Sequence, residues 1–531
     1  MSTVASLRPR AARVSSFVRS IAPSEVVPAG SSRAPRRPGV KASWVATVAG
    51  LVGALGCSVD PVNVTDVCEP LGEAVWLHEP PVFGTERRSF SIGLVDGQVL
   101  LSIVALADPR DRGRFTARGQ WFDERLAPVT GEIWLGDGSY LPVPRWTAFQ
   151  HRVWGQLWAV PDPSGPLPPM RQQVAIYALT PGSPAFERTP RDLPIISNYD
   201  GTDTIAFSIG ASFATAGREA RAAAAVGYGR PVFALNGIPS APVSCASFPY
   251  SCADRVMVFD SGSVYVHQYG TNPCSSMPVT PSQRAHEETL VALRDGGLGI
   301  FYRMGDGIGD AALHYSRLGP DLRVIDQPPY RVGAHDLSDL LPGGFQARAV
   351  ALDSGMVLFT ERSLPNSGNY GYFTCSDLFL VPGTGGGSGR APWQLPCRPP
   401  PDSYTDPRIA PTVTQYIALE PLANGHAAMA YGERTNFAAP LTFNGWAGGP
   451  DWQEGVFLQT MDGQGRRASD RMRVTPAGST ATWGDATIRA AGDYQVEAAT
   501  EGDVVVVVWR DTRLDAPGYY GRRYRCTTRP E

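Results

Sequence analysis

The sequence predicts an all-β protein assembled from repeated hairpins, and two observations lead to that fold class. First, the chain of 531 residues contains 57 glycines and 48 prolines. So many helix breakers are unsuited to a helical bundle and suit short strands joined by turns. Second, pairs of apolar runs around a small turn recur along the chain, whereas long stretches with a 3.6-residue period are missing. One Ala-rich segment, residues 214–225, could form a single helix or a loop.

The repeated unit consists of two apolar runs separated by Asp, Asn or Gly, which is the pattern of a β-hairpin. Taking one turn glycine from each copy gives Gly97, Gly155, Gly229, Gly297, Gly355, Gly425 and Gly502. Further strand-like sequence follows each copy, as in residues 456–465. Seven copies therefore predict a β-propeller of seven four-stranded blades, with six or eight blades as alternatives. The copies are 58 to 77 residues apart, which predicts long loops, where binding residues tend to lie.

The last copy carries a resemblance to a known group of proteins. Residues 502–513, with Trp509-Arg510-Asp511-Thr512-Arg513, and residues 518–524 resemble the Val-Val-Trp-x-Asp-x-Arg and Tyr-Gly-x-Arg pattern of secreted bacterial β-propeller repeats. The turn sequence after Met461 is similar to the outer hairpin of the same repeats. The resemblance implies a propeller outside the cytoplasm. It implies no catalytic residue, because that group has no common activity.

The N-terminal region has the composition of an export signal. Residues 1–41 carry seven arginines and Lys41 against one acid, Glu25, and an uncharged stretch follows at 42–56. A basic region followed by a short apolar core is typical of a signal peptide, and 15 residues are too few for a transmembrane helix. We therefore expect 1–56 to be a cleaved or disordered leader, 57–85 an anchor or linker with a possible closing strand, and 86–531 the propeller. A start codon nearer Val40 would leave an ordinary short signal.

The apolar stretch ends in Ala54-Leu55-Gly56-Cys57, which resembles the bacterial lipobox, where the cysteine is lipidated. It departs from that pattern in having Ala three places before the cysteine. We expect Cys57 to carry a lipid, with cleavage at a plain signal peptide as the alternative. The predicted location is extracytoplasmic, either in the cell envelope at the outer membrane or cell surface, or secreted. The membrane is then a partner through the lipid anchor only.

The remaining cysteines are candidates for disulfides, because exported proteins pass through oxidising compartments. Cys375 and Cys397 flank a predicted hairpin centred on residues 383–389, and two of Cys245, Cys252 and Cys274 could pair around another hairpin. Cys68 precedes the apolar residues 74–77, and Cys526 lies in the last predicted strand. A propeller needs its two ends held together to avoid open strand edges. Cys68–Cys526 could therefore join the two chain ends within one blade.

Composition excludes several classes of function. The only lysine is Lys41, so the folded part lacks the lysine of pyridoxal enzymes, P-loop NTPases and protein kinases. After residue 56 the chain has 39 basic and 49 acidic residues. The sequence contains no basic patch, so we expect no nucleic-acid partner. The sequence contains no C-x-x-C pair and no H-E-x-x-H motif, so we predict no metal site and no cofactor.

The predicted function is that of a binding or scaffold module for a glycan or protein ligand. Four late copies place an arginine just after the second apolar run: Arg303, Arg362, Arg434 and Arg510. These arginines are candidates for an anionic ligand, because guanidinium groups bind carboxylates and phosphates in a bidentate manner. Adjacent acids such as Glu361, Glu433 and Asp511 offer the alternative of local ion pairs.

The competing hypothesis is a carbohydrate-active hydrolase, sialidase-like or another glycosidase, with its site at the propeller channel. The S-x-D-x-G-x-x-W boxes of sialidases and the G-x-S-x-G elbow of esterases are absent. No catalytic residue can be named from the sequence. Two carboxyl groups about 5–10 Å apart in a deep polar pocket would favour the hydrolase.

Overall fold

The protein was analysed as a computed structural model, in which the chain divides into two units, Met1–Pro61 and Val62–Glu531. The structure describes residues 64–79, 89–108, 111–138, 145–159, 173–192, 195–197, 204–208, 222–239, 255–261, 264–268, 289–304, 312–325, 330–332, 348–363, 375–384, 387–396, 412–436, 452–476, 496–511 and 518–530. All regular elements within these ranges are β-strands. The domain boundaries expected from the sequence, 1–56, 57–85 and 86–531, remain predictions.

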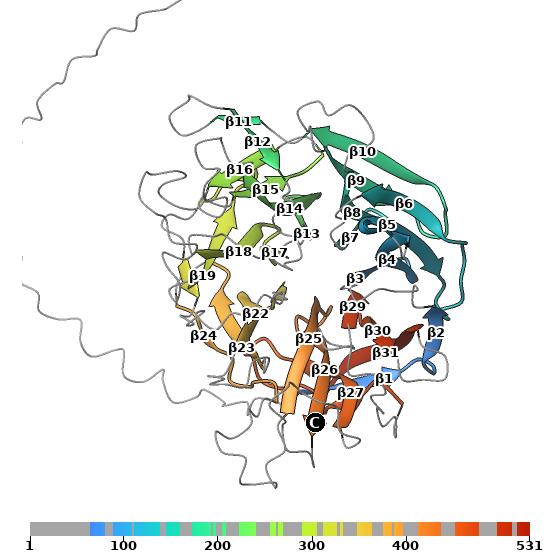
Figure 1. Ribbon diagram of the computed structural model, residues 1–531. Coiled ribbons are helices and arrows are strands. Elements are labelled where there is room, and N and C mark those ends of the chain that lie inside the picture. Colours follow the sequence, from blue (N-terminus) through green and yellow to red (C-terminus); the bar gives the residue numbers. More distant parts are fainter. Residues whose placement is uncertain are drawn as a thin grey trace, which may run out of the picture. The chain divides into compact units, whose positions relative to one another are not determined.

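Seven antiparallel sheets stand in a ring, as the sequence predicts (Figure 1). Blades 1 and 2 are β3 (Ser89–Val95), β4 (Gln98–Asp108), β5 (Asp111–Phe122) and β6 (Ile133–Gly138), then β7 (Trp146–Phe149), β8 (Arg152–Ala159), β9 (Gln173–Leu179) and β10 (Phe186–Asp192). Blade 3 is β13 (Ala222–Gly227), β14 (Arg230–Pro239), β15 (Arg255–Phe259) and β16 (Val264–Gln268), with β11 (Ile195–Ser197) and β12 (Thr204–Ser208) added beside β14.

The remaining blades follow the same order from the inner strand outward. Blades 4 and 5 are β17 (Thr289–Ala292), β18 (Leu298–Met304), β19 (Ala312–Leu318) and β20 (Tyr330–Val332), then β21 (Arg348–Ala351), β22 (Met356–Ser363), β23 (Cys375–Pro382) and β24 (Gly389–Arg390). Blade 6 is β25 (Thr412–Pro421), β26 (Ala427–Asn436), β27 (Trp452–Met461) and β28 (Met472–Arg473). Blade 7 is β29 (Val496–Glu501), β30 (Val504–Asp511), β31 (Gly518–Pro530), β1 (Val64–Pro70) and β2 (Val75–His78).

The cores lie between neighbouring blades, because each sheet is buried on both faces. In β30 the side chains of Val505, Val507 and Trp509 pack toward blade 6, whereas Val506 and Val508 pack toward blade 1. A strand buried on both faces needs apolar residues at consecutive positions, since side chains alternate between faces. This explains why the strand has an unbroken valine run. The inner strands contact one another in sequence, and β29 contacts β3, which closes the ring.

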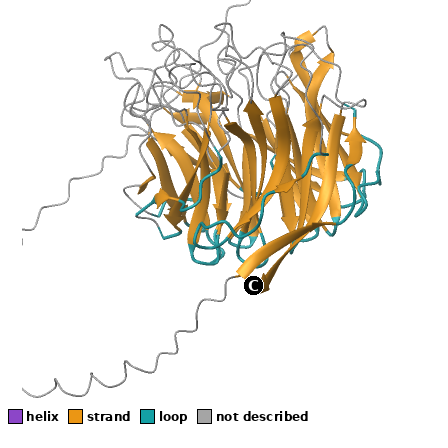
Figure 2. Ribbon diagram, turned by 90° about the horizontal axis from the view of Figure 1, so that it is seen from below, coloured by secondary structure: helices purple, strands orange, loops and turns teal. Residues whose placement is uncertain are grey.

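The turns between the first and second strand of each blade define one end of the ring, which we call the turn end (Figure 2). The structure confirms the predicted turns at Gly97, Gly229, Gly297, Gly355, Gly425 and Gly502. The prediction for blade 2 is wrong, because the turn there lies at Gln150-His151 and Gly155 lies inside β8. Gln150 and His151 both have positive φ, at 49° and 57°, which allows a two-residue hairpin without glycine.

Hydrogen bonds between turns join neighbouring blades at the turn end. The amide of Asp353 in blade 5 donates to the carbonyl of Gly425 in blade 6, at 3.1 Å. The amide of Ala423 then donates to the carbonyl of Gly502 in blade 7, at 3.0 Å. The carboxylate of Glu501 accepts the amides of Asp96 and Gly97 in blade 1, at 2.8 and 2.7 Å. These bonds fix the turn end across three successive blade boundaries.

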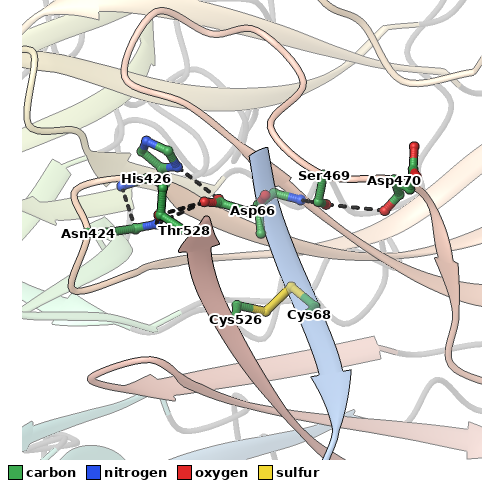
Figure 3. Close-up of a disulfide and its surroundings, with 9 residues drawn as sticks. Asp66, Cys68, Asn424, His426, Ser469, Asp470, Cys526 and Thr528 are labelled. Carbon is green, nitrogen blue, oxygen red and sulfur yellow. Dashed lines mark hydrogen bonds and ion pairs between the residues drawn. A yellow bond between two sulfur atoms is a disulfide. The ribbon is translucent and has the colours of Figure 1, made fainter. Parts of the chain in front are cut away.

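The first and last strands of the propeller, β1 and β31, both lie in blade 7. Strand β1 pairs with β31 from Val64 opposite Pro530 to Pro70 opposite Tyr524, and β2 continues along the same strand. Cys68 faces Cys526 and forms a disulfide with it, with a Cα–Cα distance of 4.0 Å (Figure 3). The predicted closing strand and its disulfide are thereby confirmed. The open edge that the last blade would otherwise present is covered by the N-terminal strand.

Candidate functional site

A cluster of charged side chains meets at the axis of the ring. Arg145 precedes β7 of blade 2, Arg348 opens β21 of blade 5, and Glu497 is the second residue of β29 in blade 7. These three residues lie in, or directly before, the innermost strands of three different blades, and both arginines contact Glu497. Their contact therefore places them at the centre of the ring. We call Arg145, Arg348, Glu420 and Glu497 the axial cluster.

The carboxylate of Glu497 is held by both arginines. Arg348 Nη2 donates to both oxygens of Glu497, at 2.8 Å to Oε1 and 2.6 Å to Oε2, and Arg145 Nη1 donates to Oε2 at 2.9 Å. The side chains are 12% exposed for Arg348, 19% for Arg145 and 10% for Glu497. Charges with so little access to water need close partners, because burial of an unpaired ion costs several kcal/mol. The cluster satisfies this requirement through charge-assisted hydrogen bonds.

Glu420 of β25 is the fourth member of the axial cluster. It is the second-to-last residue of β25 and lies opposite Ala428, whereas Glu497 is the second residue of β29 and lies opposite Val508, so the two carboxylates lie at different heights on neighbouring inner strands. Burial among the inner strands raises the pKa of Glu420 to about 7; the positive charges of Arg348 and Arg145 oppose this shift, and the negative charge of Glu497 adds to it. The side chain keeps partial access to solvent although protein surrounds it. Glu420 can therefore hold or release a proton near neutral pH.

The arrangement combines groups that act differently on a ligand. The arginines supply N–H donors and positive charge, the oxygens of Glu497 are occupied by those donors, and Glu420 is an acid that titrates near neutrality. When Glu420 is protonated the axial cluster has two cations and one anion. The centre of the ring then favours a negatively charged or hydroxyl-rich group over a cation.

The four arginines predicted from the sequence lie at one end of the ring. Each stands within two residues of the end of the second strand in its blade, in β18, β22, β26 and β30, at the end opposite to the turn end. The side chains of Arg303, Arg362 and Arg434 lie outside the described residues, and Arg510 is partly buried next to the buried Asp511. Glu433, expected as a local partner, pairs with Arg471 at 2.9 Å. A role of the four predicted arginines in binding an anionic ligand remains a prediction.

The other sequence predictions concern residues that the structure leaves out or describes in part. Cys57, Cys245, Cys252, Cys274 and Cys397 lie outside the described residues, as does the side chain of Cys375. Among the described residues no group of three or more His, Cys, Asp or Glu side chains could hold a metal ion. The described part of the chain contains no helix that is long and apolar enough to cross a membrane.

The axial cluster is not among the sites predicted from the sequence, although the sequence contains a signal for it. Glu420 and Glu497 each interrupt an apolar inner strand at the same distance from a turn glycine. A charged residue in a strand that is otherwise buried indicates a specific partner or a functional site. The arginines that meet Glu497 come from blades 2 and 5, more than 100 residues away in sequence. Their proximity could not be predicted without the ring.

Comparisons with known proteins support no assignment beyond the fold. No family model and no curated protein matches the chain. A Dyadobacter fermentans protein of unknown function is 9% identical, covers 87% of this chain and 99% of its own, and has a TM-score of 0.39. Trypanosoma rangeli sialidase is 9% identical over 76% of this chain and 57% of its own, with a TM-score of 0.35. The endosialidase of phage phi92 is 8% identical over 87% of this chain and 70% of its own, with a TM-score of 0.37.

Proposed function

We propose that this chain is an exported, lipid-anchored binding module of the cell envelope, and that its ligand is a glycan bound at the axis of the ring. The observation that carries the proposal is the axial cluster, in which Arg145, Arg348, Glu420 and Glu497 converge from four blades. The export part rests on the basic leader and on the lipobox-like sequence before Cys57.

A glycan suits the axial cluster because the cluster offers both kinds of hydrogen-bonding group. Arg145 and Arg348 are donors, and Glu420 accepts or donates according to its protonation. Hydroxyl groups need donors and acceptors side by side, and an acidic sugar gains further from the arginines. The predicted arginines of β18, β22, β26 and β30 stand at the same end as the first residues of the inner strands.

The hydrogen bonds that both carboxylate oxygens of Glu497 accept from arginines favour binding over hydrolysis. Both of its oxygens accept hydrogen bonds from arginine side chains. A carboxylate engaged in this way has fewer lone pairs left to activate water or to attack a sugar carbon. A glycosidase of the usual kind needs one carboxyl as a proton donor and another as a base or nucleophile.

One observation favours a glycosidase as the second candidate. Glu420, with a pKa of about 7, has the protonation behaviour of a general acid at neutral pH, and a second carboxylate belongs to the same cluster. Pairs of carboxyl groups whose environments separate their pKa values are typical of glycoside hydrolysis. In that mechanism Glu420 would protonate the leaving-group oxygen.

A glycan array and a panel of chromogenic glycosides, applied to the same preparation, separate the two functions. The binding proposal expects retained glycans, no turnover, and loss of the array signal in Arg348→Ala. The matched control is Arg529→Ala, which removes an exposed arginine of β31 that pairs with Glu69 at the surface. Turnover abolished by Glu420→Gln would replace binding with hydrolysis, and an array without signal for any glycan would refute the proposed ligand class.

Detergent partitioning tests the anchor independently of the ligand. An acylated Cys57 should carry the protein into the detergent phase, and Cys57→Ser should return it to the aqueous phase. Aqueous behaviour of both forms would exclude the lipid anchor and leave the axial site untouched.

A further inference from the structure

We propose that β1 is a detachable strap held on the ring by two locks of different chemistry, the Cys68–Cys526 disulfide and the Asp66–His426 ion pair, so that pH controls the strap once the disulfide is reduced. The strap is defined as residues 64–70. The first lock responds to redox conditions and the second to protonation.

The strap lies between two blades. On one side it forms a complete antiparallel ladder with β31, which includes the disulfide between Cys68 and Cys526. On the other side the amide of Asp66 donates to the carbonyl of Ala468 in blade 6, at 2.6 Å. Figure 3 shows Asp66 and Cys68 two residues apart on the same strand, with blade 6 beside Asp66. Loss of the strap would therefore uncover β31 and remove the bond from Asp66 to Ala468, one of the contacts between blades 6 and 7.

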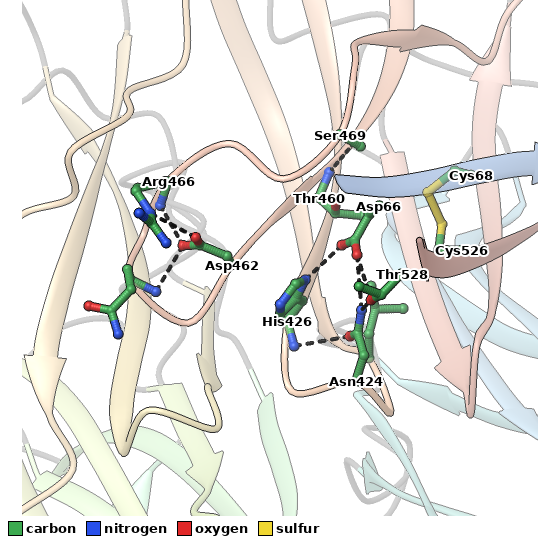
Figure 4. Close-up of polar contacts among 12 residues, drawn as sticks. Asp66, Cys68, Asn424, His426, Thr460, Asp462, Arg466, Ser469, Cys526 and Thr528 are labelled. Atoms are coloured by element: carbon green, nitrogen blue, oxygen red, sulfur yellow. Dashed lines mark hydrogen bonds and ion pairs between the residues drawn. A yellow bond between two sulfur atoms is a disulfide. The ribbon is translucent and has the colours of Figure 1, made fainter. Parts of the chain in front are cut away.

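Asp66 is the polar centre of the second lock. Its side chain is fully buried, Oδ2 receives a hydrogen bond from His426 Nδ1 at 2.8 Å, and Oδ1 receives bonds from Thr528 at 2.8 Å and Asn424 at 3.1 Å. Asn424 and His426 belong to the turn between β25 and β26, and Asn424 Oδ1 in turn accepts the His426 amide at 3.1 Å (Figure 4). A single strap carboxylate thus joins the turn of blade 6 to β31.

The protonation of His426 decides whether this contact is an ion pair. The hydrogen bond to Asp66 raises the pKa of His426 above its ordinary value of 6.5, although partial burial opposes the shift. Burial acts to raise the pKa of Asp66, but the hydrogen bonds from His426 and Thr528 hold it below 3.8. The histidine contribution is complete below pH 6.5 and is lost as the pH rises through its raised pKa. The aspartate contribution is present above pH 3.8 and is lost at lower pH, so the lock is strongest between these two values.

The other charged groups around the histidine act in the same direction. Asp462 after β27 and Asp353 in the turn of blade 5 also raise the pKa of His426. Asp462 pairs with Arg466 of its own blade at 2.8 Å, and Asp353 pairs with Arg294 of blade 4 at 3.5 Å. On the faces formed by β31 and β27 the neighbours of Asp66 are the neutral Thr528 and Thr460 (Figure 4). Asp66 is therefore the direct partner whose loss would uncouple the strap from pH.

Opening the first lock needs a dithiol reductant. A dithiol thiolate attacks one sulfur, the S–S bond breaks, and the second dithiol sulfur resolves the mixed disulfide. Two electrons and two protons convert Cys68 and Cys526 to thiols while the reductant becomes a disulfide. Cys68 is the accessible end of the bond, because Cys526 is only 3% exposed and Cys68 is partly exposed.

Hydrogen exchange of the strap, measured by mass spectrometry with residues 89–95 of β3 as the internal reference, tests the proposal. Oxidised and dithiol-treated protein are compared at about pH 5.5 and about pH 9, on either side of the histidine titration. We expect relative exchange of residues 64–70 to rise by about tenfold or more at the higher pH in the reduced protein, because neutral His426 no longer forms an ion pair with Asp66 of the strap. The oxidised protein should show no such rise.

Variants assign the effect to the two locks. Cys68→Ser should reproduce the reduced protein without reductant, and His426→Gln in that background should remove the pH dependence. The matched control is His151→Gln, which changes an exposed histidine paired with Asp96 far from the strap. Equal strap protection at both pH values after reduction would refute the proposal. So would a strap that loosens at high pH while oxidised, or a pH response that survives His426→Gln.

Discussion

At the scale of single residues, the axial cluster shows how charge can be placed inside a β-sheet protein. Glu497 is the member that holds the cluster together, because two arginines from other blades end on its oxygens. Glu420 lies on the inner strand of the neighbouring blade, where burial raises its pKa to about 7. Burial among the inner strands thus sets the protonation behaviour of Glu420.

Replacement of Glu497 should destabilise the protein more than loss of a surface ion pair. Glu497→Gln removes the carboxylate charge that both Arg145 and Arg348 contact inside the ring, which should cost on the order of 3 kcal/mol of unfolding free energy. Urea denaturation monitored by tryptophan fluorescence measures the change. Glu69→Gln is the control, because Glu69 and Arg529 are 60% and 57% exposed and exposed pairs contribute about 1 kcal/mol or less. Similar losses in both variants would contradict a structural role for the cluster.

The pKa of Glu420 predicts how stability depends on pH. Its folded value of about 7 lies above the ordinary value of 4.5, so the folded protein favours the protonated acid and loses stability as the pH rises from 4.5 through 7. Glu420→Gln should remove this part of the slope and stabilise the protein at pH 8 by no more than about 3 kcal/mol. Denaturation midpoints at pH 5 to 8 measure the difference. A variant curve parallel to that of the original protein would show that Glu420 titrates normally.

At the scale of elements, blade 2 explains why one turn was misplaced. Gly155 looked like a turn glycine, but it lies in β8 directly opposite Trp146 of β7. A Cβ at Gly155 would clash with the indole ring of Trp146, so glycine is needed here for packing and not for a turn. The indole Nε1 of Trp146 donates to Ser102 Oγ in blade 1 at 2.7 Å. The glycine thus makes room for a side chain that links two blades.

Gly155→Ala should therefore destabilise the protein through overpacking, by about 1–3 kcal/mol. A smaller ring at the facing position should relieve the clash, so Trp146→Phe combined with Gly155→Ala should lose less than the two single changes together. Chemical denaturation of the original protein, the two single variants and the double variant completes this double-mutant cycle. Gly389→Ala in β24 is the control, because nothing lies within 4 Å of the added methyl group. Additive losses would mean that Gly155 and Trp146 do not interact.

At the scale of the whole molecule, ring closure depends on two chain segments 458 residues apart in sequence. The strap covers the edge of β31, the disulfide holds it covalently, and Asp66 joins it to blade 6. A cross-link across so long a loop restricts the unfolded chain strongly. Closure therefore affects the stability of every blade, since each blade is buried between two neighbours.

Loss of the disulfide should lower the free energy of unfolding by about 2–5 kcal/mol. Cys68→Ser, Cys526→Ser and the double variant should all lose the same amount, because each removes the same bond. Guanidinium denaturation of the three variants, and of the original protein after dithiol treatment, provides the comparison. A double variant that loses the sum of the two single effects would show that the cysteines act separately.

The sequence by itself determined the fold class, six of the seven inner turns and the closing disulfide. These features depend on local patterns: apolar runs fix the strands, Asp, Asn and Gly fix the turns, and a propeller leaves few places for its two ends. Gly155 escaped because glycine serves turns and close packing alike, and only the position of Trp146 distinguishes them. The tertiary structure alone decided the axial cluster and the polar lock around Asp66. Both are contacts between blades, whose partners are brought together by closing the ring and leave no regular spacing in the sequence.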